Sequence, residues 1–294
     1  MIWPALPYEA WRDTKDTLHM CLQVIGKVRL ALTPREPQWA NVPLHMTARG
    51  LTTTPMRASQ VIFEVVVDFI DHEVRIETST GHIQKIPLAS RPVAEFYEEF
   101  MSRLRGLKID VEISTTPSEV RDPIPFPEDT VHATYDPAWA NRFWSTLTQV
   151  ALVMDEHRAR FRGKTSAVHF FWGSFDLANT RYSGRPADPG PNADLIMRLS
   201  HDAEQICAGF WPGDQQFPQP AFYAYTFPKP DGIETAVVRP SSATWNTDIG
   251  EFILPYDAAR HAGDPRQALL DFLESTYAAG ASRLDWSPDL VSTR

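Results

Sequence analysis

Residues 167–185 read AVHFFWGSFDLANTRYSGR and combine five aromatic residues with an unusual number of polar side chains. Aromatic residues favour strands, so this stretch predicts a β-strand, although strands in protein cores rarely carry so many polar groups. Successive residues of a strand point to opposite faces, which would separate His169 from Ser174 and Asp176. A β-bulge at Gly173 would shift the alternation by one residue and bring these three side chains to one face. We therefore predict a functional site on that face.

The composition is typical of a globular protein. The chain has 294 residues, which is enough for one large domain or two modest ones. Apolar residues make up 43% and charged residues 22%, so a disordered or fibrous chain is not indicated. The 25 prolines fix many backbone φ angles and interrupt helices and strands, which predicts long ordered loops.

The charge pattern limits the classes of partner. The formal net charge is −9, and no run of basic residues forms the stripe that nucleic-acid binding requires. No apolar stretch approaches the roughly 20 residues that span a bilayer, and the first residues lack the pattern of a signal peptide. We therefore expect a cytoplasmic protein without nucleic-acid or membrane partners. Cys21 and Cys207 are isolated in apolar surroundings, which predicts buried thiols and excludes a zinc cluster built on cysteine.

Proline-rich sequence divides the chain into two halves. The predicted parts are an N-terminal α+β lobe (residues 1–116), a Pro-rich crossing (117–137) and a C-terminal α+β lobe (138–294) with an insertion at about 182–220. The predicted fold class is α+β, with two lobes of antiparallel sheet backed by helices. In both halves a histidine follows an apolar residue where a strand begins, at His45 and His169. This likeness leaves pseudo-duplication and coincidence open.

The spacing of apolar residues predicts the main helices. An amphipathic helix should begin after Pro7 and end near Gly26, followed by an extended segment over residues 27–32. The same spacing predicts helices over residues 92–104, 139–161, 193–208 and 265–279.

Several long and compositionally unusual motifs carry a family resemblance. They are TLHMCLQVIGK (residues 17–27), ARGLTT (48–53), HFFWGSFDL (169–177), RYSGR (181–185) and GFWPG (209–213). On these motifs the chain resembles, over nearly its whole length, the uncharacterised bacterial family called domain of unknown function 5996. The resemblance implies no activity, cofactor or catalytic residue, so candidate residues come from the sequence itself.

The candidate catalytic residues are His169, Asp176 and Ser174. A nucleophilic serine needs a neighbouring imidazole, and that imidazole needs a carboxylate to hold it in place. No Gly-x-Ser-x-Gly motif is present, which disfavours a serine hydrolase. His169 is therefore expected to act as a general base or a metal ligand, with Asp176 orienting it. The alternative is a polar strand that only holds the following loop in place.

A metal site is a second interpretation of the histidines. His169, His201 and Glu204 are the candidate ligands of a divalent metal, because imidazoles and carboxylates from separate elements can converge on one ion. Glu204 would follow His201 by about one helical turn. No compact His-x-His or His-Glu-x-x-His spacing is present, so structural roles for these residues stay open.

Two arginines and two tryptophans are the candidate substrate-binding residues. Arg181 and Arg185 could hold a carboxylate or phosphate through paired hydrogen bonds. Trp172 and Trp211 could form the apolar walls of the same pocket. The alternative is that the arginines pair with structural acids and that the tryptophans fill the core.

Together these features predict an enzyme that acts on a small anionic or aromatic molecule, with or without a His-bound divalent metal. The predicted groove is lined by His, Asp, Arg and aromatic side chains. The alternative is a non-catalytic module that binds a ligand or another protein. Solid packing around Trp172 and Trp211 would contradict an enzyme, whereas an exposed flat patch would favour a protein partner.

Overall fold

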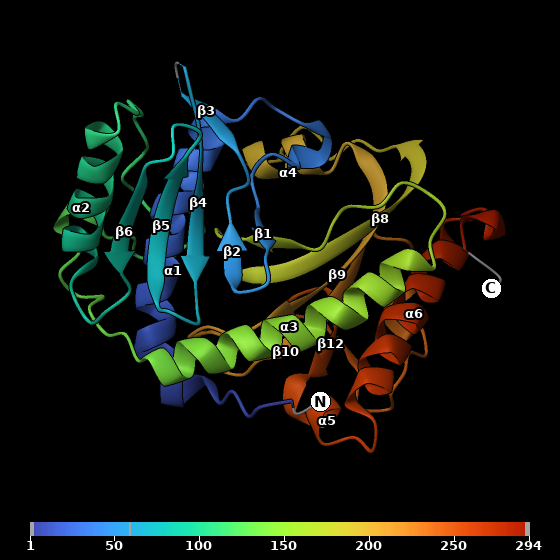
Figure 1. Cartoon of the computed structure of the whole chain (residues 1–294). Coiled ribbons are helices and arrows are strands. Elements are labelled where there is room, and N and C mark those ends of the chain that lie inside the picture. The colour runs from blue at the N-terminus through green and yellow to red at the C-terminus, as the bar shows by residue number, and fades with distance from the viewer. Residues whose placement is uncertain (1–2, 59, 292–294) are drawn as a thin grey trace.

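The strands of both halves of the chain join in a single antiparallel sheet (Figure 1). The computed structural model describes residues 3–58 and 60–291. Within these residues the strands are β1 (Leu44–Met46), β2 (Gly50–Thr52), β3 (Met56–Ala58), β4 (Val61–Asp68), β5 (Glu73–Thr78), β6 (Ile83–Pro87), β7 (His169–Phe171), β8 (Asp176–Pro186), β9 (Ala203–Trp211), β10 (Ala221–Phe227), β11 (Thr244–Asn246) and β12 (Glu251–Pro255). The helices are α1 (Tyr8–Leu32), α2 (Val93–Gly106), α3 (Pro137–Ala159), α4 (Leu195–Ser200), α5 (Tyr256–Arg260) and α6 (Pro265–Arg283), with short 3-10 helices η1 (Pro37–Trp39), η2 (Phe126–Glu128), η3 (Ile233–Thr235) and η4 (Pro288–Leu290). The predicted α+β class with antiparallel strands is confirmed.

Two short strands in the middle of the sheet connect its halves. The strand order is β11-β12-β10-β9-β8-β7-β1-β2-β4-β5-β6, and β3 pairs with β4. β1 pairs with β7, where His45 lies opposite His169. The two predicted half-sheets therefore meet edge to edge at the β1–β7 pair. From β1 to β6 and from β7 to β11, neighbouring strands in the sheet are mostly neighbours in the chain. The lobe boundaries and the pseudo-duplication stay predictions.

The first helix is longer than predicted. α1 continues through Gly26 to Leu32, so the end predicted at Gly26 and the extended segment predicted for residues 27–32 are wrong. Gly26 is there because the indole ring of Trp172 packs against it: a Cβ atom would lie 2.2 Å from Cγ of that ring. The glycine therefore allows a close contact within a helix and does not end it.

The helix predicted over residues 193–208 is also wrong. α4 contains only residues 195–200, and the chain then continues as the strand β9. Most of β9 is buried on both faces, from Gln205 to Phe210. A strand buried on both faces has a nearly continuous apolar sequence, whose spacing does not distinguish it from a helix.

The long helices cover one face of the C-terminal half of the sheet. α3 and α6 lie side by side in Figure 1 and contact each other, and α6 also contacts β9 and β10. The aromatic core lies beneath α3, where the ring of Phe143 stacks on Phe175 with centroids 5.2 Å apart. Among the described residues, no helix combines the length and the apolar character needed to cross a membrane. Cys21 and Cys207 are buried and unpaired, as predicted.

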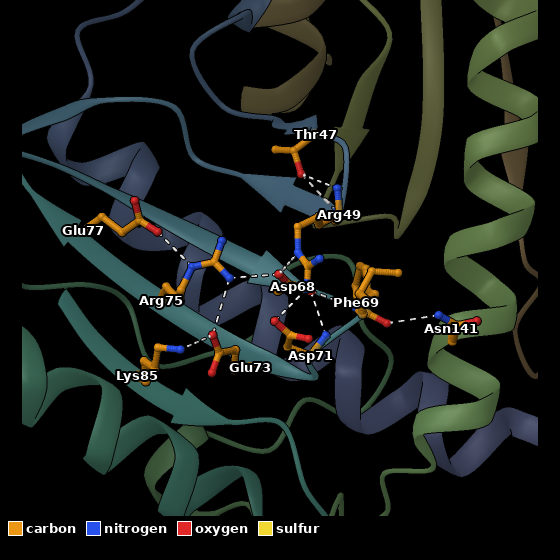
Figure 2. Close-up of polar contacts among 12 residues, drawn as sticks. Thr47, Arg49, Asp68, Phe69, Asp71, Glu73, Arg75, Glu77, Lys85 and Asn141 are labelled. Carbon is orange, nitrogen blue, oxygen red and sulfur yellow. Dashed lines mark hydrogen bonds and ion pairs between the residues drawn. The ribbon is translucent and has the colours of Figure 1, made fainter.

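The N-terminal half of the sheet carries an ionic network centred on Asp68 (Figure 2). The buried carboxylate accepts hydrogen bonds from Arg49 Nε at 2.5 Å and Arg75 Nη1 at 2.8 Å. Although burial disfavours its charged form, these bonds and backbone N–H donors hold the pKa of Asp68 well below its ordinary value. The network satisfies its own charges, so we assign it a structural role.

Candidate functional site

The predicted aromatic strand is a β-hairpin. β7 and β8 are joined by a turn over residues 172–175, so the bulge predicted at Gly173 is wrong. Phe171 lies opposite Asp176, and His169 lies opposite Ala178. Residues opposite each other in an antiparallel pair share a face. The hairpin therefore places His169 and Asp176 on one face, as a bulge would have done.

That face forms the floor of a cavity of about 840 Å³. β7, β8, β9, β10 and β12 contribute the floor, while α4, η1 and loop residues such as Glu119 line its edges. Its aromatic lining consists of Trp39, Phe171, Trp172, Tyr182, Trp211, Tyr223 and Tyr225. A cavity of this size and composition is typical of small-molecule sites.

A glycine in β9 lets a tyrosine reach across the sheet. Tyr223 lies opposite Gly209, which lies opposite Ala178 in the next strand. The Tyr223 ring lies over Gly209, because a Cβ atom at that position would be 2.3 Å from Cζ of the ring. The Tyr223 hydroxyl group consequently donates a hydrogen bond to Asp176 on β8.

Asp176 is the buried polar centre of the cavity floor. Its two carboxylate oxygens accept hydrogen bonds from the hydroxyl groups of Ser174 and Tyr223. Burial raises its pKa, although both hydroxyl donors oppose the shift. His169 lies diagonally from Asp176 at roughly 7–8 Å between Cα atoms and does not bond to it. The predicted arrangement, in which Asp176 orients His169 beside a serine, is therefore not formed.

His169 is a buried imidazole without a protein partner. Its side chain lines the cavity, the residue is 6% exposed, and neither ring nitrogen bonds to a residue in the described part of the chain. Burial, then the neighbouring charges of His45 and Arg29, lower its pKa to about 3. His169 is thus a neutral imidazole at neutral pH and can donate one hydrogen bond and accept one.

The sequence analysis missed two carboxyl groups of the cavity, those of Glu119 and Glu251. Partial desolvation by the surrounding cavity residues, followed by the nearby charge of Asp176, raises the pKa of each to about 7, although the Glu119 residue is exposed on its outer side and Glu251 is half-buried. Neither carboxyl group bonds to a described residue. Glu251 begins β12, two residues before Ile253, which lies opposite Tyr223. The alternation of Tyr223 and Tyr225 with apolar residues could have marked this face, whereas no sequence pattern marks Glu119.

The loop that carries Glu119 is attached to α1. Gln23 forms two hydrogen bonds of 2.7 Å with the backbone of Ser118, one to its carbonyl and one from its N–H group. Lys27 Nζ donates to Ser118 Oγ at 2.9 Å. The Glu119 side chain then extends along Gly173, where a Cβ atom would lie 2.1 Å from its Oε1. Glu119 therefore stands at the mouth of the cavity, with solvent on its other side.

The two arginines predicted to bind substrate do not line the cavity. Arg181 is 1% exposed and faces α3 and α6, where it bonds to the carbonyl group of His157 and lies 3.6 Å from Glu274. Arg185 pairs with Glu204 at 2.7 Å. Both arginines therefore have structural roles, because each forms an ion pair with a glutamate of another element. The arginines that were predicted to bind an anionic ligand are therefore not available in the cavity.

The three predicted metal ligands do not converge. His201 lines the cavity, as does His169, but Glu204 accepts hydrogen bonds from Arg185 and Trp286 elsewhere. Glu204 is in β9 and His201 follows α4, so the helical spacing that linked them does not exist. Across residues 3–58 and 60–291, no three His, Cys, Asp or Glu side chains are grouped so that they could hold a metal ion.

Both predicted tryptophans line the cavity, in different ways. Trp172 is buried, and its Nε1 donates to the carbonyl group of Val42 at 2.9 Å. Trp211 is half-buried and stacks on Phe217, with ring centroids 5.7 Å apart. The aromatic residues therefore form the walls of a cavity. They do not form a solid core or a flat exposed patch.

One family model describes nearly the whole chain. The model of DUF5996, a family of unknown function, matches residues 3–293, which confirms the resemblance predicted from the motifs. Neither the curated proteins nor the solved structures gave a match. The cavity is therefore the basis for a functional assignment.

Proposed function

Because the chain belongs to DUF5996, a family of unknown function, we propose its function from the chemistry of the cavity. The proposed function is that of an enzyme that binds a small molecule with a flat apolar body and transfers a proton to or from it. One observation carries the proposal: the carboxyl groups of Glu119, Asp176 and Glu251 meet aromatic rings in one cavity of about 840 Å³. The aromatic walls suit the apolar body, and the carboxyl groups suit proton transfer.

Glu119 and Glu251 are the proposed acid–base groups. A general acid or base is most effective when its pKa lies near the working pH, and the pKa of each is about 7. One can thus donate a proton while the other accepts one. Asp176 holds the hydroxyl groups of Ser174 and Tyr223 in the lining of the same cavity. His169 is proposed to bind the ligand through a hydrogen bond and not to act as the base.

A non-catalytic ligand-binding module is the second candidate. It is favoured by the pKa of His169, which at about 3 leaves this imidazole a weak base at neutral pH. Both candidates use the same cavity and the same small-molecule partner. We also propose a cytoplasmic location, which the two unpaired cysteines support.

A metabolite extract offers a direct test. The protein and a Glu119→Gln/Glu251→Gln double variant are incubated separately with an extract of small molecules, and the compounds are followed by mass spectrometry. Compounds consumed by the wild type but not by the variant support the enzyme. Compounds that only co-purify with the wild type, unchanged, support the binding module. If nothing is consumed and nothing is retained, both proposals are wrong.

A further inference from the structure

The ionisable groups that line the cavity are mainly acidic. Glu119 lies at the mouth, Asp176 on the floor and Glu251 at the start of β12. Among the described lining residues Lys164 is the sole lysine or arginine. It lies at the rim, where its ammonium group bonds to Gln38 Oε1 and stands 5.3 Å from the centre of the Tyr182 ring. Among the described residues no lysine or arginine lines the interior of the cavity, although the charges of Arg29 and Arg158 reach His169 from outside the lining.

When it is ionised, Asp176 repels the negative charge of each glutamate. Asp176 contributes to the raised pKa of both Glu119 and Glu251, after burial. The side-chain donors to Asp176 are neutral hydroxyl groups, a backbone N–H group is its other donor, and the two glutamates receive no hydrogen bond from the described residues. A positive charge placed among the three would relieve this repulsion and favour their ionised forms.

His169 independently points to a ligand. It is a polar side chain more than nine-tenths buried that lines the cavity and has no hydrogen-bond partner within residues 3–58 and 60–291. Buried polar groups nearly always have a hydrogen-bond partner, so the ring nitrogens of His169 are available to a water molecule or to a ligand group inside the cavity. As a neutral imidazole it can accept a hydrogen bond from an N–H group.

The aromatic lining suits the same chemistry. Trp172, Trp211 and Tyr223 line the cavity together with the carboxyl groups. The faces of aromatic rings attract organic cations, and this attraction is stronger where water is excluded.

We propose that the ligand of this cavity is an organic amine or guanidine on a flat apolar body. The inference rests on the proposed function, since it concerns the same cavity, and it names the substrate class. The cationic group binds among Glu119, Asp176 and Glu251, His169 accepts one of its hydrogen bonds, and the aromatic rings hold the apolar body. This class replaces the anionic ligand predicted from Arg181 and Arg185.

Matched probes separate charge from shape. For each of three flat bodies, indole, phenyl and naphthyl, an ethylamine, an ethyl and an acetate derivative are titrated into the protein at pH 8 by calorimetry. At least one amine should bind about tenfold more tightly than its neutral counterpart, which corresponds to about 1.4 kcal/mol. The corresponding acetate should bind more weakly than either.

Variants identify the groups responsible. The Glu119→Gln/Glu251→Gln double variant should lose most of the preference for the amine and keep its affinity for the neutral probe. Glu112→Gln, at an exposed position outside the cavity lining, is the matched control and should keep the preference. Circular dichroism and the unfolding midpoint without ligand establish that each variant is folded.

Each outcome decides the proposal. If neutral or acetate probes bind as tightly as the amines, or if the double variant keeps the preference, the cationic ligand is wrong while the proposed function stands. If no probe on any of the three bodies binds, both the ligand class and the proposed function are contradicted.

Discussion

His45 and His169 lie opposite each other in β1 and β7, with ring centroids 5.2 Å apart and ring planes at 82°. Arg29 of α1 adds a guanidinium group, whose Nη2 lies 3.4 Å from His45 Nε2. Protonation of either imidazole would place like charges side by side at the junction of the two half-sheets. Burial, followed by the charge of Arg29, lowers the pKa of His45, and burial, followed by the charges of His45 and Arg29, lowers that of His169.

We therefore expect His169→Gln to make the protein less sensitive to acid. Below pH 6.5 the unfolded chain protonates His169, whereas the folded protein keeps it neutral down to about pH 3, so stability falls with the pH in this window. The slope of the unfolding free energy between pH 6 and 4 should decrease by about 1.4 kcal/mol per pH unit in the variant. Urea unfolding at several pH values measures it. The exposed His82→Gln is the control, and equal slopes for both variants would contradict the prediction.

Tyr223→Phe should destabilise the protein and disturb the cavity floor. The substitution removes the hydroxyl donor to Asp176, a buried carboxyl group that would keep only Ser174 as a side-chain donor. The expected loss is about 1–3 kcal/mol in unfolding free energy. Tyr225→Phe is the matched control, since Tyr225 also lies on β10 and lines the cavity but does not bond to Asp176. A smaller effect for Tyr223 than for Tyr225 would show that the Asp176 contact is unimportant.

The Glu119→Gln/Glu251→Gln double variant should respond differently to pH from the wild type. In the folded protein these carboxyl groups keep their protons up to about pH 7, whereas in the unfolded chain they lose them near the ordinary value of 4.5. Their contribution to stability is therefore present below pH 4.5 and lost as the pH rises through 7. The difference in stability, variant minus wild type, should therefore be more positive at pH 8 than at pH 5. Thermal unfolding at both pH values, with Glu112→Gln as the control, tests this; a constant difference would refute it.

Arg181→Ala should destabilise the fold strongly. A large loss of stability in the absence of ligand is expected of a structural arginine and not of one that only binds a ligand. The substitution leaves the partly buried carboxylate of Glu274 without this positive neighbour and empties the space between the rings of Phe161 and Tyr277. Breaking a buried ion pair costs about 3–5 kcal/mol. Arg185→Ala breaks an exposed pair and should cost less than about 1 kcal/mol. Chemical denaturation gives both values, and similar losses would argue against the structural role.

Much of the fold could be predicted from local sequence. Apolar spacing identified several of the long helices, and the aromatic and polar sequence of residues 167–185 identified a region of strand. These patterns failed at Gly26, because the reason for that glycine is a ring that arrives from residue 172, far away in the sequence. They failed again at β9, because a strand buried on both faces shows no alternation.

The candidate site was predicted only in part. His169, Asp176 and Trp211 line the cavity. The sequence could identify this region because a high density of polar and aromatic residues in a strand indicates an exposed or hollow surface. Arg181 follows the alternation of β8 to the opposite face, so its charge is directed into the helices. Glu119 could not be found, since it lies in a Pro-rich segment without periodicity and reaches the cavity only through the bonds of Ser118 to Gln23.

The packing of Trp172 against Gly26 means that the first half of the chain supports a cavity wall that belongs to the second half. One wall belongs to the hairpin of the second half, yet the support behind it is the first helix, and Gln38 and Glu119 come from the first half and the crossing. The C-terminal half supplies most of the lining, but expressed alone it would lack the wall formed by η1, the Glu119 carboxyl group and the helix that supports Trp172. A substitution at Gly26, in the first half, would therefore displace Trp172 and change a cavity that is built mainly from the second half.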